Sequence, residues 1–120
     1  MESKDLDQAH DLLVKQVLND QTLTYREFAF ALEITEAPVI NKCTTILEKL
    51  MHEDAKNRRP ILSAMVIQQG SLAIPRSGFY QILNRLNLYQ GDEQGAEAIH
   101  WHQMEMNKLK KYYNSEHNEK

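Results

Sequence analysis

Apolar residues recur along most of the chain at the three- and four-residue spacing that marks one face of an α-helix. In residues 35–56, for example, Cys43, Leu47 and Leu50 lie three or four residues apart. This spacing stops after residue 56. Residues 61–68 form a mostly apolar run of strand length, and a shorter run at 72–74 follows a Gly-Ser turn, so the two runs predict a β-hairpin. The predicted helices span residues 4–18, 25–33, 35–56, 78–87 and 96–113.

The second of these helices has the best-defined beginning. Thr24 precedes it and Glu27 follows three residues later, so each side chain can satisfy the backbone amide of the other in a capping box. Leu23 and Phe28 occupy the two positions of a hydrophobic staple, which fixes the direction in which the chain enters the helix. The pattern predicts a short helix that begins directly after Thr24.

The next helix is predicted to start after a short joint at residues 33–35. Thr35 is its expected N-cap, and Pro38 fits the first turn because its missing amide has no intrahelical partner there. Two closely joined helices that follow a first helix and precede a hairpin are typical of a winged helix-turn-helix. The sequence therefore predicts an α+β, mostly helical, winged-helix-like fold with extra C-terminal helices. Residues 1–113 are expected to form one domain, and residues 114–120 a polar, frayed tail.

The charge of the chain is small in total and uneven along its length. The 120 residues carry a net charge of −3, which excludes a polybasic, histone-like mode of nucleic-acid binding. Residues 61–90 contain no acidic residue and two arginines, so a positive face is expected only in the middle of the chain. No apolar run is long enough to cross a bilayer and no signal peptide is recognisable. We therefore expect a cytoplasmic protein without a membrane partner.

The predicted solvent-exposed face of helix 35–56 carries the residue types that contact base edges and phosphates. Arginines on both sides of the predicted hairpin would hold phosphates beside it. Tyr25 begins a helix, where backbone amides attract phosphate, but it fits a packing role equally well. A plain solvated helix face is the alternative, since Glu48 lies among the basic residues. The expected nucleic-acid-binding residues are Tyr25, Arg26, Asn41, Lys42, Thr45, Lys49, Arg58, Arg59 and Arg76.

The C-terminal helix offers a different kind of surface. Trp101, Met104 and Tyr112 would present an adaptable apolar face to a protein partner or to a second copy of the chain. Trp101 also fits a packing role. These residues predict a protein-interaction surface as the alternative to DNA binding.

The other chemically active residues form no recognisable site. His102 and Glu105 share a helix face, but His100 does not join them, which leaves too few ligands for zinc. The adjacent residues 52–54, His-Glu-Asp, do not converge on a helix, and Cys43 lies on an apolar stripe as an inert thiol. The four glycines form no phosphate-binding loop. No catalytic residue, metal or cofactor is expected.

Residues 23–29, Leu-Thr-Tyr-Arg-Glu-Phe-Ala, resemble the T-Y-x-E-x-A start of the DNA-binding domain in alkylguanine DNA alkyltransferases and alkyltransferase-like proteins. The resemblance implies that Tyr25 lies at a helix-turn-helix and contacts DNA. The chain departs from that family at two functional positions. Ala-Pro-Val at 37–39 replaces its arginine finger, and Ser-Ala-Met-Val at 63–66 stands where the family has P-C-H-R or P-W-H-R. Alkyl transfer is therefore not expected, and base flipping has no support.

Over nearly its whole length the chain resembles a group of small bacterial proteins. They share a T-Y-R-E-F-A-like start, an E-D-A helix, the pattern R-P-x-x-S-A-x-V, a proline, G-F-F or G-F-Y, and a final helix with a tryptophan. The later motifs are carried here by residues 53–55, residues 59–66, Pro75, residues 78–80 and Trp101. The resemblance implies the winged-helix-like fold and no mechanism.

These observations together predict a non-enzymatic protein that binds double-stranded DNA, as a regulator or an accessory of a nucleic-acid-processing system. The alternative is a protein-interaction adaptor or inhibitor on the same scaffold.

Overall fold

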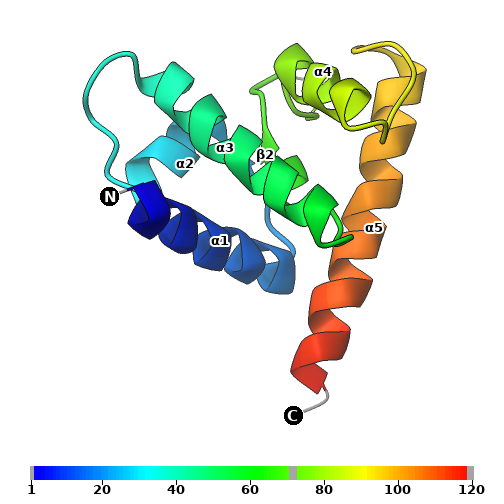
Figure 1. Ribbon diagram of the computed structural model, residues 1–120, viewed down its shortest axis with the longest axis horizontal. Helices are drawn as coiled ribbons and strands as arrows, with labels where there is room; N and C mark the ends of the chain where they lie inside the picture. Colours follow the sequence, from blue (N-terminus) through cyan, green and yellow to red (C-terminus); the bar gives the residue numbers. More distant parts are fainter. Residues whose placement is uncertain (1, 71–72, 119–120) are drawn as a thin grey trace.

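The computed structural model describes residues 2–70 and 73–118 (Figure 1). In this part the chain is mostly helical, with a small two-stranded parallel sheet, as the coarse fold class predicts. Figure 1 shows α3 crossing the molecule between α1 and α4, with α5 along one edge. Of the helices described, none is long and apolar enough to cross a membrane. The elements are α1 (Glu2–Asn19), β1 (Leu23–Thr24), α2 (Tyr25–Ala31), α3 (Val39–Lys56), the 3-10 helix η1 (Leu62–Met65), β2 (Val66–Ile67), α4 (Ser77–Arg85) and α5 (Ala96–Asn118).

The capping box at the start of α2 is confirmed. The Thr24 amide donates to Glu27 Oε1 at 2.8 Å, and the Glu27 amide donates to Thr24 Oγ1 at 3.1 Å. The helix that follows is amphipathic: Phe28 is fully buried, whereas Phe30 is 87% exposed. Local sequence was sufficient here because both partners of the cap lie within one turn.

The predicted N-cap of α3 was wrong by three residues. The helix begins at Val39, with Pro38 and not Thr35 as its N-cap. Ala37 precedes a proline, and the proline ring disfavours helical backbone angles at that residue. The joint between α2 and α3 is consequently longer than the sequence predicted.

The predicted β-hairpin was also wrong. Residues 62–65 form η1, and β2 pairs in parallel with β1, so that Leu23 lies opposite Val66 and Thr24 opposite Ile67. Of the predicted return strand at 72–74, residue 72 lies outside the described residues and residues 73 and 74 form no strand. Ala73 instead adopts a left-handed backbone conformation with φ of 54°. The apolar run is buried, as expected, but partners distant in sequence decided its conformation.

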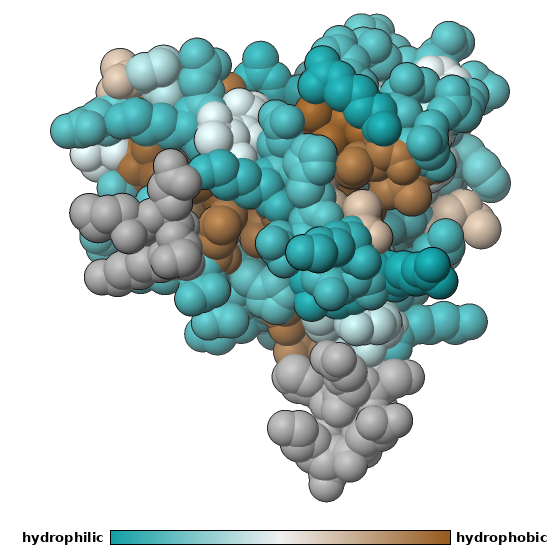
Figure 2. Space-filling view, viewed as in Figure 1, coloured by the Kyte–Doolittle hydropathy of each residue, from teal (hydrophilic) through white to brown (hydrophobic). Residues whose placement is uncertain are grey.

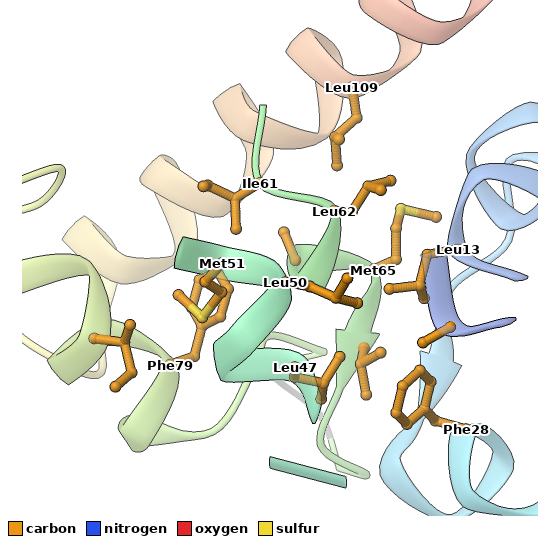
Figure 3. Packing of buried hydrophobic residues seen from close by; sticks show 14 of the residues in the cluster. Leu13, Phe28, Leu47, Leu50, Met51, Ile61, Leu62, Met65, Phe79 and Leu109 are labelled. Carbon is orange, nitrogen blue, oxygen red and sulfur yellow. The ribbon is translucent and has the colours of Figure 1, made fainter. Parts of the chain in front are cut away.

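The buried apolar side chains of all five α-helices and of η1 belong to one cluster. Figure 3 shows its centre, where the apolar side of α3 faces residues 61–65. Side chains from α1 and α2 close the cluster on one side, and those from α4 and α5 close it on the others. The labelled members are Leu13, Phe28, Leu47, Leu50, Met51, Ile61, Leu62, Met65, Phe79 and Leu109.

The buried face of α5 differs from the predicted stripe. Leu109 and Tyr113 are buried, but the predicted Ile99 and Met106 are only half-buried, and the polar side chains of His102 and Glu105 are buried instead. Helix α5 also continues through residues 114–118, where a frayed tail was expected; residues 119 and 120 lie outside the described part. The backbone of this segment continues the 23-residue helix because adding a residue to an existing helix costs far less than starting a new one.

Candidate nucleic-acid interface

A groove of about 370 Å³ runs between α3 and α4. Figure 2 shows apolar side chains in the hollow between these helices, with hydrophilic side chains around it. Exposed polar residues of α3 form one rim, and exposed polar residues of α4 and its N-cap form the other. The lining residues are Tyr25, Ile40, Asn41, Thr44, Leu47, Glu48, Met51, Ser63, Arg76, Gly78, Phe79, Gln81, Ile82 and Arg85.

Tyr25 is placed in the groove by the capping box that starts α2. Its ring is buried, its hydroxyl accepts the Arg76 amide at 3.1 Å, and the Arg76 guanidinium carbon lies 5.7 Å from the ring centroid. Burial raises the pKa of the phenol, so its hydroxyl stays neutral and keeps its proton. Tyr25 therefore packs beneath α4 and lines the groove at the same time.

The two arginines of the groove stand at opposite ends of α4. Arg76 is the N-cap, where the first amides of the helix lack intrahelical partners and the helix dipole favours an anion. Arg85 is exposed in the last turn. Nine residues of helix separate them by about 13 Å, a distance that spans several phosphates of one nucleic-acid strand.

The potential nucleophiles near the groove are engaged in packing. The Ser63 hydroxyl is buried and donates to the Leu47 carbonyl at 2.8 Å. Cys43 is buried, with its sulfur 3.8 Å from the Tyr25 carbonyl oxygen, and burial raises the pKa of its thiol. Among the described residues, no group of three His, Cys, Asp or Glu side chains is arranged to hold a metal ion.

Part of the predicted binding set faces away from this groove. Asn41 and Arg76 line it with Tyr25, but Lys42, Thr45 and Lys49 line a second groove of about 450 Å³ on the α1 side of α3. Lys42 forms an ion pair there with Glu36 at 3.1 Å. Arg26 lines a third, wide depression beside α2. The residues that the sequence pattern places on one polar face of this helix thus line two different grooves, one on each side of α3.

Arg58 and Arg59 lie beyond the other end of α3. Arg58 follows the C-cap Asn57 in a left-handed conformation with φ of 57°, and the backbone amides of Arg58 and Arg59 bond to carbonyls of the last turn. The chain then turns toward α5, so the two arginines join Trp101 in a pocket of about 360 Å³. About 20 Å of helix axis separates this pocket from Asn41.

The predicted partner-binding residues are divided between packing and exposure. The Trp101 ring lies 5.8 Å from that of Phe79 and about as close to two tyrosine rings, so it is part of an aromatic cluster. Met104 is half exposed, and Tyr112 packs against Tyr113 at 4.8 Å between ring centroids.

Sequence reasoning missed several residues of the α3/α4 groove. Gln81 and Arg85 of α4 line it opposite Thr44 and Glu48 of α3. The signal for Arg85 was present in the sequence, because Arg76 and Arg85 are the two arginines of the acid-free stretch 61–90. Their common orientation required the structure.

Comparison with protein-family models, curated protein sequences and solved structures found no match for this chain.

Three buried polar side chains hold the segment that underlies the groove. Asp54 Oδ2 accepts the Leu62 amide at 3.0 Å, and Glu105 Oε2 accepts the Ile61 amide at 2.7 Å. His102 Nε2 lies 2.8 Å from the Ala64 carbonyl oxygen, so this nitrogen carries the proton. Burial raises the pKa of both carboxyls and lowers the pKa of the imidazole.

We expect His102 to make folding stability depend on pH near neutrality. Burial holds the pKa of His102 in the folded protein below its ordinary value of about 6.5, so the unfolded chain binds the proton more readily. The stability that the neutral imidazole contributes is therefore complete above about pH 6.5 and is lost as the pH falls from there through the lower, folded pKa. Urea unfolding between about pH 7.5 and pH 5.5 measures this loss. His102→Gln keeps a donor for the Ala64 carbonyl without the titration. The two carboxyls titrate in both proteins, so equal pH dependence of the two proteins would contradict the assignment.

Proposed function

We propose that the protein binds double-stranded DNA through the α3/α4 groove and catalyses no reaction. The observation that carries the proposal is the position of Arg76 and Arg85. The stretch 61–90 has no acidic residue, and both of its arginines line this groove opposite the polar side of α3. Phosphate contacts from such residues supply most of the affinity of a protein for nucleic acid.

In this proposal α4 holds the sugar-phosphate backbone. Arg76 and the first amides of α4 contact one phosphate, and Arg85 contacts another on the same strand. Asn41 and Thr44, which face α4 from the N-terminal half of α3, then reach base edges, since amide and hydroxyl groups pair with bases in the major groove.

The proposal includes a winged-helix use of the scaffold. Helices α2 and α3 serve as the helix-turn-helix, and the loop between β2 and α4 takes the role of the wing. The backbone amide of Gln68 donates to the Ile74 carbonyl at 2.9 Å and so joins the two sides of this connection, and Arg76 lies two residues after Ile74. A regulator, or an accessory of a nucleic-acid-processing system, is the role that such a non-enzymatic module fits.

Glu48 bears on specificity. It is the acidic residue of the groove lining, on the α3 rim among Asn41 and Thr44. A carboxylate repels phosphate but accepts a hydrogen bond from the amino group of cytosine. We therefore expect the backbone of the DNA to follow the α4 rim and the bases to face α3.

Removing both groove arginines is expected to weaken DNA binding and its dependence on salt. For Arg76→Gln with Arg85→Gln, the slope of log K against log salt should fall by about 2, one for each lost phosphate contact. Anisotropy of a labelled duplex of about 20 base pairs, between about 50 and 200 mM salt, measures this slope.

Arg58→Gln is the matched control, because it removes the same charge from the other end of α3 and should leave the slope unchanged. The proposal fails if the protein does not bind the duplex at low salt. It also fails if the double variant binds as the parent does.

A further inference from the structure

The pocket at the corner of α3 and α5 combines cations with an exposed apolar surface. Arg58, Arg59 and Lys108 contribute positive charges, the buried Glu105 contributes a carboxylate, and Leu88 and Trp101 contribute apolar surface. The pocket holds about 360 Å³, which is room for a few side chains of a ligand.

The charges that solvent can reach in this pocket are positive. Arg58 is exposed, the Lys108 side chain is 65% exposed, and that of Arg59 is 27% exposed. The nearby carboxylates are buried and occupied. Asp54 accepts Arg59 Nε at 3.0 Å and the Leu62 amide, while Glu105 accepts the Ile61 amide through Oε2 and lies 3.9 Å from Lys108 Nζ through Oε1. A ligand therefore meets the cations before it meets the acids.

The apolar part of the pocket is prearranged. Trp101 is half-buried, and its ring is held by the rings of Phe79, Tyr80 and Tyr89 at 5.8 to 6.4 Å between centroids. Leu88 is 41% exposed beside it. A rigid aromatic wall costs little conformational entropy when a ligand binds, and such residues are frequent anchors of interfaces.

We propose that this pocket binds an acidic peptide segment of a partner protein, with one apolar side chain against Leu88 and Trp101. Carboxylates that flank this side chain meet Arg58 and Lys108. The exposed apolar surface favours a peptide over nucleic acid, because a phosphate backbone would leave it uncovered. The site is separate from the α3/α4 groove, so the protein carries one surface for DNA and another for a protein.

Trp101 is the single tryptophan of the chain and reports on its own pocket. The probe is the capped peptide Asp-Glu-Leu-Glu-Asp-Leu, titrated against the 120-residue chain while tryptophan emission is recorded. Anisotropy of the same peptide, labelled, measures binding independently. We expect saturable binding in both, and weaker binding of the peptide in which serine replaces both leucines.

Two substitutions separate the charged and apolar parts. Arg58→Gln and Leu88→Ser should each weaken peptide binding about fivefold, as expected for one partly exposed ionic or apolar contact. Arg59 is not a suitable position for this test, because its substitution would also remove the ion pair with the buried Asp54. Arg85→Gln is the matched control and should leave peptide binding unchanged, just as Arg58→Gln should leave duplex binding unchanged.

The proposal is overturned if neither readout detects saturable binding up to about 1 mM peptide. It is also overturned if Arg58→Gln abolishes binding of a labelled oligonucleotide and leaves peptide binding as it was, which would make the pocket a nucleic-acid surface. Because each site has its own arginine variant, failure here is distinguishable from failure of DNA binding in the groove.

Discussion

Replacement of Asp54 by alanine is expected to lower the free energy of unfolding by about 3–5 kcal/mol, the usual result of removing one partner from a buried charge pair. The Asp54 side chain is 2% exposed. It accepts Arg59 Nε at 3.0 Å and the Leu62 amide at 3.0 Å. Alanine would leave a buried amide without an acceptor and a guanidinium without its counter-charge. Denaturant unfolding followed by circular dichroism measures the change.

Glu53→Ala is the control for this experiment. It removes the neighbouring carboxylate of the same helix, but Glu53 is exposed, so the loss should stay within about 0.5 kcal/mol. A loss below about 1 kcal/mol for Asp54→Ala would mean that the two hydrogen bonds contribute little, contrary to the usual cost of orphaned buried groups.

Replacement of Phe28 by alanine is expected to cost about 3–5 kcal/mol of unfolding free energy, as is usual for a large core side chain. Phe28 is fully buried and lies beside Leu13 at the side of the cluster formed by α1 and α2 (Figure 3). Alanine would leave a cavity that the surrounding helices fill only in part. Because α2 and α3 form the proposed DNA-binding unit, we expect the variant to bind duplex DNA more weakly near its unfolding midpoint as well.

Phe30→Ala provides an internal comparison, with the same substitution two residues along the same helix. Phe30 is 87% exposed, so its loss should change the unfolding free energy by less than about 0.5 kcal/mol. Similar destabilisation by both substitutions would contradict the burial pattern of α2.

The buried polar network gives a physical reason for two of the sequence motifs. Asp54 of the E-D-A motif and Arg59 of the R-P-x-x-S-A motif bond to one another, and Asp54 also holds the amide of Leu62. Ser63, in the second motif, ties the same segment to the Leu47 carbonyl of α3. These motif residues therefore serve the fold, and the groove receives its shape from them.

The two proposed surfaces lie at opposite ends of α3. The groove with Asn41 and Arg76 is near its N-terminal half, and the pocket with Arg58 and Trp101 follows its C-terminus. Sequence reasoning assigned Arg58, Arg59 and Arg76 to DNA and Trp101 to a partner. The structure places Arg58 and Arg59 with Trp101 because residues 57–61 turn toward α5 and no hairpin carries them back to α3.

The sequence by itself determined what depends on neighbours within one or two turns. The periodic helices, the capping box of Thr24 and Glu27, and the burial of Phe28 and Leu47 follow from local spacing and propensity. The acid-free stretch that contains Arg76 and Arg85 was likewise visible as composition.

Only the tertiary structure decided what depends on residues far apart in the chain. The apolar run at 61–68 became η1 and a parallel strand because Asp54 and Glu105 accept its amides, at separations of 8 and 44 residues. The same contacts buried polar residues on α5 where the apolar stripe predicted Ile99 and Met106. Which polar groups are buried, and which arginines share a groove, is set by hydrogen bonds and packing across the core. A single sequence contains those partners but not their pairing.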